Sequence, residues 1–520
     1  MENLYALVQC LTSAEWHSLQ KYLTCFSTHN QAQLKQLQLA KLLKEPNACP
    51  SHQTCCLKIY GVKKDARFDV LKSALKEKIL DFLLTDISSN RQSELDKLDQ
   101  AYIKIKKLSA QYKHLFHSKP KPALCYDVLD EIISLAKEYE HFPTAVEFLH
   151  EKRVGYLSLR KGAKEFEEIS SELNKYIVKQ QALMKAEQYY HHLMMLYDYN
   201  GKCDKKKVNK FLTTIISEVS HDYWQTKSPR INYYLKIFEM DYYQLNENHL
   251  KARSTCLELL TIVRNNKSVY RKQRVGVVYD HLSRCEYYLG NYKQAAEWAR
   301  EAQKHFNLGS DNYCVALEQE FYALFAQSHY EPTIEVANKM LNGATQKELG
   351  NFRYSKYNLL LANAFFRLGK YNAALNILSH EHEISKDKAG WETGLRILKI
   401  MTLIELNKSD EASLAVLNLK QFFKYIDAKD KSQIRPRDKK ILNLLLIAER
   451  NGFLFSGIPV SQVEKYLSPL HSNDADYRWE PFTHELIPFH EWFKNKCKIH
   501  KIAPYKAGVQ KISTQESIVV

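Results

Sequence analysis

Turn residues recur at a nearly constant interval in the second half of this chain. Each stands just before a helical pattern, and successive turns lie 44, 38, 41 and 38 residues apart. A period of roughly 40 residues that contains two helices is typical of an α-solenoid. A single helical hairpin cannot bury its own apolar face, so such hairpins must stack on one another. The sequence therefore predicts an all-α protein. The turn positions are Asn248, Tyr292, Tyr330, Tyr371 and Ser409.

The clearest hairpin is the stretch from Val275 to Phe306. It contains two amphipathic patterns, VGVVYDHLSRCEYYLG and NYKQAAEWAREAQKHF, which meet after Gly290. Alanines recur in the second pattern at Ala295, Ala299 and Ala302. Because the separation of two packed helices depends on the side chains at their contact, we expect these two helices to approach closely.

Two of these hairpins resemble tetratricopeptide repeats. The family's second half has a Gly-x-Tyr turn followed by alanines seven residues apart, as in Gly290–Tyr292 with Ala295 and Ala302. Gly369–Tyr371 with Ala374 is similar. The matching packing residues of the first halves are Tyr279, Leu282, Leu361, Ala362 and Phe365.

The sequence also departs from the family pattern. Glu286 stands where the family prefers an aromatic residue, and Thr333 stands where it prefers alanine. The resemblance implies a right-handed α-solenoid of tetratricopeptide-like hairpins, preceded by a small N-terminal helical domain.

We expect four parts along the chain. A Lys-Pro-Lys-Pro segment, which helices do not tolerate, separates an N-terminal helical domain of residues 1–118 from the solenoid of residues 123–433. Residues 434–502 are rich in proline and aromatic residues, as expected of a helical cap folded back over the last repeat. Residues 503–520 are expected to be a flexible tail.

A capping-box pattern predicts an early helix start in the N-terminal domain. Thr12 and Glu15 have the spacing at which each side chain can bond the other's backbone N–H. Trp16, Leu19 and Leu23 then form an apolar stripe at helical spacing.

Composition limits the class of protein. The chain of 520 residues holds only 15 glycines and 13 prolines, which favours long helices over turn-rich β or Rossmann-type folds. Its 11 cysteines fit reduced thiols better than a disulfide framework. The first residues do not resemble a signal peptide, and no apolar run is long enough to span a membrane. We therefore expect a cytoplasmic protein with no membrane partner.

Candidate metal-binding motifs are incomplete. The cluster between Cys49 and Cys56 has suitable ligand types, with Cys25 and His29 upstream, but lacks the two well-spaced pairs typical of zinc sites. We expect it to be a plain loop between helices. The pairs His484–Glu485 and His490–Glu491 do not form a His-Glu-x-x-His motif.

Enzyme motifs are equally weak. The sequence contains neither a glycine-rich phosphate loop nor a Gly-x-Ser-x-Gly nucleophile motif. We therefore expect no catalytic residues, no cofactor and no metal, although a dispersed site remains open.

The basic residues suggest an alternative partner. The formal net charge is +16, and three basic runs fall at predicted turns or helix starts, at Lys202–Lys207, Arg264–Arg274 and Arg435–Lys440. Solvated surface charge is the simpler explanation. If the runs line one edge of the solenoid, they form a ridge that can meet the phosphates of RNA or DNA.

The tetratricopeptide resemblance implies a binding face. In that family the first helix of each hairpin lines the concave side, which here places an aromatic groove of mixed charge along the repeats. We expect this groove to bind a peptide or helix of a partner protein, so that the chain is a non-enzymatic interaction scaffold. The alternative is a nucleic-acid-binding repeat protein, and the oligomeric state stays open. The predicted groove residues are Lys236, Met240, Tyr243, Asp280, Arg284, Tyr287, Glu318, Tyr322, Phe325, Asn363 and Phe366.

Overall fold

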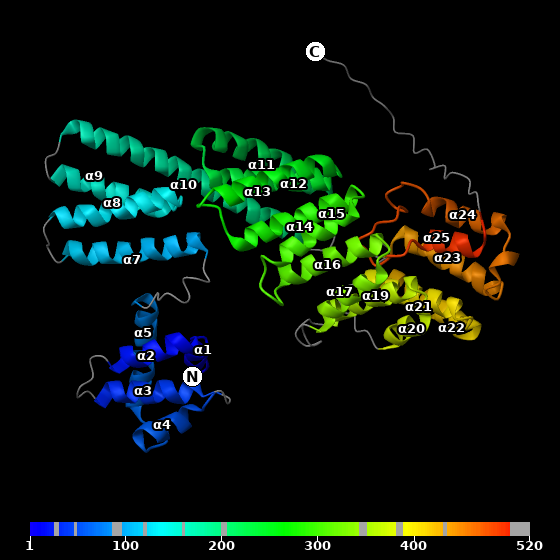
Figure 1. Ribbon diagram of the computed structural model, residues 1–520, viewed down its shortest axis with the longest axis horizontal. Helices are drawn as coiled ribbons and strands as arrows, with labels where there is room; N and C mark the ends of the chain where they lie inside the picture. The colour runs from blue at the N-terminus through cyan, green and yellow to red at the C-terminus, as the bar shows by residue number, and fades with distance from the viewer. Residues whose placement is uncertain are drawn as a thin grey trace, which may run out of the picture. The chain divides into compact units, whose positions relative to one another are not determined.

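The computed structural model confirms an all-α chain (Figure 1). It describes residues 1–24, 31–45, 49–85, 96–117, 122–158, 162–198, 205–342, 351–380, 388–429 and 434–499. Within these ranges every regular element is helical. None of the helices described there has both the length and the apolar character that a membrane span requires. Cys25, His29 and the predicted tail of residues 503–520 lie outside the described residues.

The chain forms two compact units. The first comprises residues 1–238 and 261–271, and the second comprises residues 239–260 and 272–520. Helices α12 (Pro229–Leu245) and α13 (His249–Asn265) therefore contribute residues to both units.

The first unit begins with five short to medium helices that share a core. They are α1 (Glu2–Gln9), α2 (Ser13–Thr24), α3 (Gln31–Lys44), α4 (His52–Tyr60) and α5 (Ala66–Thr85). Their core contains Leu19, Leu39 and Phe68, each fully buried. The predicted capping box is confirmed, because the Thr12 N–H donates to Glu15 Oε2 at 2.8 Å and the Glu15 N–H donates to Thr12 Oγ1 at 3.3 Å.

The prediction that the Cys49–Cys56 cluster is a loop is wrong for most of its residues. Residues from His52 onward form α4, whose N-cap Ser51 accepts a hydrogen bond from the Thr54 N–H. Cys55 and Cys56 are fully buried in the core. The missed signal was this Ser-x-x-Thr start, which is a common N-cap arrangement.

Longer hairpins follow in the first unit. They are built from α7 (Lys97–His117), α8 (Pro122–Glu138), α9 (Phe142–Ser158), α10 (Ala163–Asp198) and α11 (Lys205–Thr226). From α7 to α11, each helix packs against the one that follows it. The hairpin pattern therefore begins well before Asn248, where the sequence periodicity was readable.

The second unit continues the hairpins with shorter helices. The first helices are α14 (Lys272–Tyr288), α16 (Asp311–Ala326), α19 (Asn351–Arg367), α21 (Thr393–Glu405) and α23 (Pro436–Arg450). The second helices are α15 (Tyr292–Gln303), α17 (Tyr330–Asn342), α20 (Tyr371–Ser379), α22 (Ser409–Lys429) and α24 (Val460–Leu470), and α25 (Phe489–Lys496) ends the described part. Consecutive helices pack together, and α14 also contacts α16, as α19 contacts α21. This is the neighbour pattern of stacked hairpins, and four second helices begin at the predicted turn positions.

One backbone geometry recurs at the hairpin turns. Two residues before α9, α13, α15, α17, α20 and α22, a residue adopts a left-handed conformation with φ between 50° and 81°. The next residue donates its N–H to the carbonyl oxygen five residues earlier, as Asn291 does to Glu286 at 2.9 Å. This pair of features is the Schellman end of a helix, which satisfies carbonyl groups that the helix leaves free. The left-handed residues are Glu140, Glu247, Gly290, Ser328, Gly369 and Asn407.

Replacing Gly290 tests the cost of this turn. Gly290 has φ +81°, and a Cβ built on it meets no atom within 4 Å, so any penalty must come from the backbone. We expect Gly290→Ala to lower the free energy of unfolding by about 1 kcal/mol. Gly457 also has open space around its Cβ position but no positive φ, so Gly457→Ala should be nearly neutral. Equal effects in urea denaturation would contradict the backbone explanation.

Candidate functional site

A segment of the second unit leaves the helical stack and crosses it. Residues 473–488 contain no helix, and Arg478–Pro488, which we call the strap, lie against α14, α16, α19 and α21. We call the face of these four helices that the strap covers the first-helix wall. The sequence predicted a cap over the last repeat, but the strap reaches back three hairpins further, to the level of α14.

The strap places one aromatic ring in the first-helix wall. The ring of Phe482 lies 4.6 Å from that of Tyr287, 5.4 Å from that of Tyr288 and 4.7 Å from that of Tyr322, measured between centroids. The guanidinium group of Arg284 lies 5.8 Å from the centre of the Phe482 ring. Three tilted or edge-on ring contacts and one cation make this a specific aromatic site.

A buried ion pair fixes the end of the strap nearest α25. Arg437 on α23 is 1% exposed, and its Nε and Nη2 donate to the Glu485 carboxylate at 2.6 Å and 2.7 Å. Its other bonds go to the carbonyls of Leu470 and Tyr477 and to His490 Nδ1. Because a buried guanidinium needs all its donors satisfied, these bonds hold the strap end in one position.

Asp438 on α23 and His484 of the strap form a second polar pair, next to Arg437. Burial would raise the pKa of Asp438, but His484 and Arg435 outweigh it and hold that pKa below its ordinary value. Arg435 donates to both Asp438 oxygens, at 2.8 Å and 3.0 Å. His484 belongs to the strap, so this pair adds to the anchor.

The other end of the strap is held at the surface. Arg478 donates to both oxygens of Glu247, at 2.6 Å and 2.9 Å, in the loop before α13. The Glu247 side chain is 50% exposed and that of Arg478 is 32% exposed. An ion pair this open to water and salt contributes little to stability, about 0–1 kcal/mol.

A close backbone approach brings the strap against α21. A Cβ added at Gly394 would lie 2.7 Å from the carbonyl oxygen of His484, which is closer than real Cβ contacts. Glycine is therefore required at this position.

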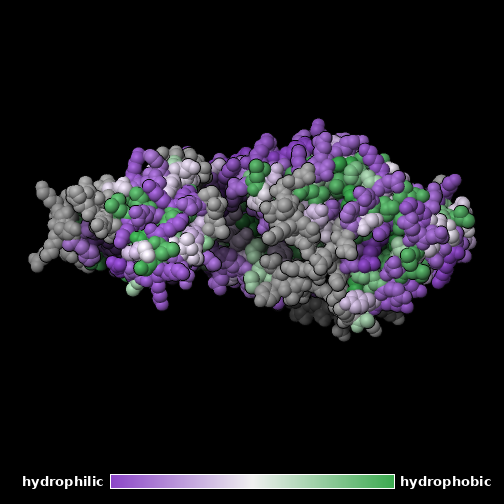
Figure 2. All heavy atoms as spheres, turned by 90° about the horizontal axis from the view of Figure 1, so that it is seen from below, coloured by the Kyte–Doolittle hydropathy of each residue, from purple (hydrophilic) through white to green (hydrophobic). Residues whose placement is uncertain are grey.

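Cavities flank the strap where it crosses the wall. One cavity, of about 180 Å³, lies between the wall and the strap. Its lining includes Tyr287, Tyr322 and Phe325 of the wall and Trp479 and Leu486 of the strap. Another, of about 260 Å³, is lined by Phe366, Glu405, Pro488 and Trp492, among others. On the face that Figure 2 shows, hydrophobic residues are interspersed with hydrophilic ones.

Half-buried carboxyl groups lie near Arg284 on the same side of the repeats. Burial raises the pKa of Asp241 to about 7 and that of Asp280 to about 6, and Arg284 opposes both shifts. The Asp280 Oδ1 atom is buried without a hydrogen-bond partner. Arg284 itself is exposed and makes no hydrogen bond or ion pair with a described residue. Burial lowers the pKa of the neighbouring His281 to about 3, so this imidazole is neutral.

The eleven predicted groove residues differ in their location and burial in the structure. Lys236 belongs to the first unit, so it is not placed with the rest. Met240, Asn363 and Phe366 are at most 6% exposed and act in packing. Glu318 accepts from Lys356 at 2.6 Å, and Tyr243 and Asp280 are half-buried. The residues that line the strap are Arg284, Tyr287, Tyr322, Phe325, Asn363 and Phe366. A binding role for any of the eleven stays a prediction.

The sequence analysis missed Phe482 and Asp241. Phe482 was seen only as one aromatic residue of a proline-rich segment, and nothing local indicated which wall it would meet. Asp241 lies one residue from the predicted Met240, so a shift of about 100° around α12 separates the two. That shift is within the uncertainty of assigning a helix face from sequence.

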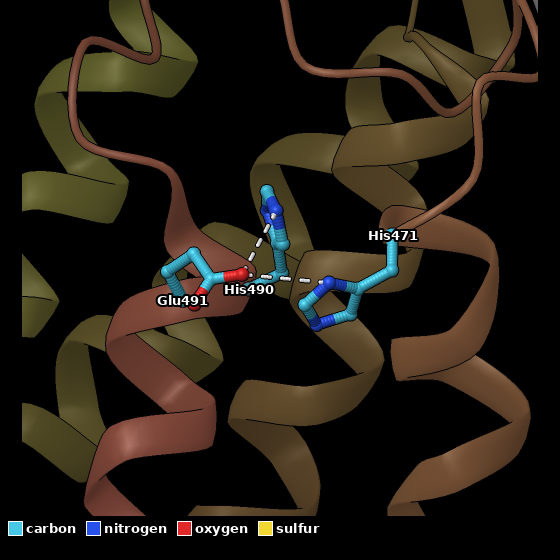
Figure 3. Close-up of side chains that lie close together, drawn as sticks. All are labelled: His471, His490 and Glu491. Atoms are coloured by element: carbon cyan, nitrogen blue, oxygen red, sulfur yellow. Dashed lines mark ion pairs between the residues drawn. The ribbon is translucent and has the colours of Figure 1, made fainter. Parts of the chain in front are cut away.

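Three side chains could hold a metal ion by distance alone. His471 Nδ1 lies 3.5 Å from Glu491 Oε1, and His490 Nε2 lies 3.8 Å from the same oxygen (Figure 3). His490 Nδ1, however, faces the Arg437 Nη2 donor at 2.8 Å. A neutral histidine that accepts at Nδ1 carries its proton on Nε2, so that nitrogen has no free lone pair for a metal. The donor set does not fit a metal centre.

The predicted basic ridge loses residues to internal bonds. Arg437 is buried, and Lys439 donates to Asp427 at 3.0 Å. Lys267 is paired with Glu138, and Arg271 is paired with Asp99. Residues 202–204 of the remaining run lie outside the described residues. These four are among the thirteen basic residues in the three runs, and each is thus buried or paired within the chain.

The chain is similar in structure to a protein described as "Crystal Structure of the Apo Form of RapI". The two are 16% identical, the match covers 64% of this chain and 86% of that chain, and the TM-score is 0.45. No family model and no curated protein matches the chain. A likeness this distant says nothing about the function of this chain.

Substituting Arg437 tests the buried anchor. Arg437→Met leaves Glu485 buried without its partner, and we expect the free energy of unfolding to fall by about 3–5 kcal/mol. The double variant Arg437→Met with Glu485→Gln should lose less than the sum of the two single losses. Additive losses in chemical denaturation would show that the two side chains do not act as a pair.

Asp280 gives a pH-dependent prediction. Because its folded pKa is about 6 and its ordinary value is 3.8, the folded chain loses stability through this group as pH rises from about 4 to 6. Asp280→Asn removes that loss, so we expect it to stabilise the protein by about 1–2 kcal/mol above pH 6 and by nothing below pH 4.

The control for Asp280 is Glu297→Gln, at an exposed carboxylate on α15. This variant should leave the free energy of unfolding unchanged across the same range. Melting curves between pH 3.5 and 8 measure both, and a stabilisation by Asp280→Asn that does not vary with pH would contradict the assignment.

Proposed function

We propose that the chain is a non-enzymatic protein-binding scaffold, and that the first-helix wall holds an extended segment of a partner protein. One observation supports this above the others. The wall already holds eleven residues of its own chain in non-helical conformation, with an aromatic ring inserted between tyrosines. A surface that accommodates one extended segment has the shape and chemistry to accommodate another.

The charges beside Phe482 support a binding role. Arg284 is exposed without a bonding partner among the described residues, and Asp241 and Asp280 are held in surroundings that disfavour their ionised forms. Groups kept in such surroundings reduce stability, and perturbed groups of this kind concentrate at functional sites. Tyrosine, which lines the wall, offers large contact area with few rotatable bonds.

Affinity capture with matched variants tests the scaffold. The tagged full-length chain, Arg284→Gln and Lys293→Gln are used to capture partners from lysate of the source cell, and co-purifying proteins are quantified. Lys293 lies exposed on α15, which is not one of the four helices of the wall, and its replacement changes the charge equally. We expect at least a tenfold lower yield with Arg284→Gln and an unchanged yield with Lys293→Gln.

The lysate is also treated with nuclease before capture. Equal capture by the Arg284→Gln and wild-type chains would contradict the proposal. Loss of capture on nuclease treatment would instead favour the nucleic-acid alternative.

A further inference from the structure

Phe482 occupies a site that suits a side chain from another protein. Its ring is half-buried and covers Tyr287 and Tyr322, which are 9% and 4% exposed with the strap in place, while Tyr288 stays 43% exposed. The three tyrosines belong to α14 and α16, whereas the occupant comes from a segment outside the helical stack. A cavity of about 180 Å³ also borders Tyr287 and Tyr322, two of the three tyrosines of the site.

We propose that this position is the docking site for an aromatic residue in an extended segment of the partner, and that the strap occupies the site when no partner is bound. The proposal rests on the scaffold function above and specifies its partner and its regulation. A partner segment inserts its ring between Tyr287, Tyr288 and Tyr322 in place of Phe482, and Arg284 covers the ring face.

The two anchors of the strap differ enough to allow this exchange. Glu485 is held by a buried guanidinium, whereas Arg478 is held by an exposed pair with Glu247. Release of the exposed Glu247 pair frees residues 478–483, while Arg437 keeps its bonds to the Tyr477 carbonyl on one side and to Glu485 on the other. The displaced part, which we call the arm, is then a short loop whose two ends stay held by Arg437.

The local bonds of the arm also permit release. Thr483 Oγ1 donates to the Glu480 carbonyl at 2.8 Å, and Arg478 pairs with Glu480 at 3.1 Å. Both bonds lie within the arm, so they can persist when it moves. Besides the Glu247 pair, the arm meets the wall through the ring contacts of Phe482 and, across the cavity of about 180 Å³, through Trp479 and Pro481. The Trp479 Nε1 bond to the Glu485 carbonyl, at 2.7 Å, ties the arm to its own Glu485 end and not to the wall.

A peptide copied from the strap tests the proposal with a defined probe. The probe is fluorescein-labelled DYRWEPFTHEL, which corresponds to residues 476–486. In the wild-type chain the tethered copy competes with it, whereas Phe482→Ala vacates the ring site. We expect the probe to bind Phe482→Ala at least tenfold more tightly than wild type in fluorescence anisotropy. A probe with alanine in place of its phenylalanine should bind Phe482→Ala at least tenfold more weakly than the intact probe.

A second variant controls for the possibility that Phe482→Ala disturbs folding. Arg478→Ala removes only the exposed anchor, so its helicity and melting should match wild type, and it should bind the probe with intermediate affinity. Equal binding of the probe to wild type and both variants would overturn the proposal. So would equal binding of the intact and alanine probes to Phe482→Ala.

Partner capture separates this proposal from the scaffold proposal. If capture depends on Arg284 but neither opened variant binds the probe or captures more partner, the scaffold stands and the strap proposal is wrong. If the opened variants bind the probe while Arg284→Gln captures as much partner as wild type, the aromatic site is real and the scaffold proposal fails.

Discussion

The buried pair of Arg437 and Glu485 determines what the second unit can present to a partner. A guanidinium that is 1% exposed must have its donors satisfied, and here the partners come from α24, the loop after it, the strap and α25. Four separate stretches of chain are thus held by one side chain. Together with the buried side chains of Leu486 and Ile487, this convergence fixes the path of the strap and so brings Phe482 to the wall.

The stacked hairpins supply the other half of the arrangement. The recurrent left-handed turn sets the point at which each second helix begins, and small residues such as Ala295 and Ala299 then let neighbouring helices pack closely. Since the same geometry recurs, side chains at equivalent places on α14, α16 and α19 fall side by side. Tyr287 and Tyr322 meet the same ring for this reason, although 35 residues separate them in sequence.

The stacking was largely predictable from sequence, and the site was not. Gly290 and Gly369 mark the turn because glycine adopts positive φ without penalty, and the helices that follow began where expected. At Glu140, Glu247 and Ser328 the same geometry is carried by residues with no such local signature. The hairpin around Glu140 lies within the predicted solenoid of residues 123–433, but without a glycine at its turn it could not be aligned with the later repeats.

The site depends on contacts that no local pattern encodes. In the sequence, Glu485 stands out only as part of an incomplete metalloprotease motif. In the structure it is the ion-pair partner of Arg437, which lies 48 residues away in sequence. Glu286 likewise departs from the tetratricopeptide pattern because it is a buried acceptor for Arg253 and Asn291. In both cases a charge that looks anomalous in sequence is explained by a partner from another helix.

A tethered occupant changes which partners the wall can bind. A short linked segment competes at an effective concentration of about a millimolar, so a free segment with similar contacts cannot displace it at cellular concentrations. The apparent affinity of any partner falls by the fraction of chains in which the arm is open. A successful partner must therefore gain contacts that the arm lacks, such as a hydrogen bond to Arg284 or to Asp280, or contacts within the cavity that borders Tyr287 and Tyr322. The strap therefore excludes aromatic segments that bind weakly, and the charges next to it select among the segments that bind more tightly.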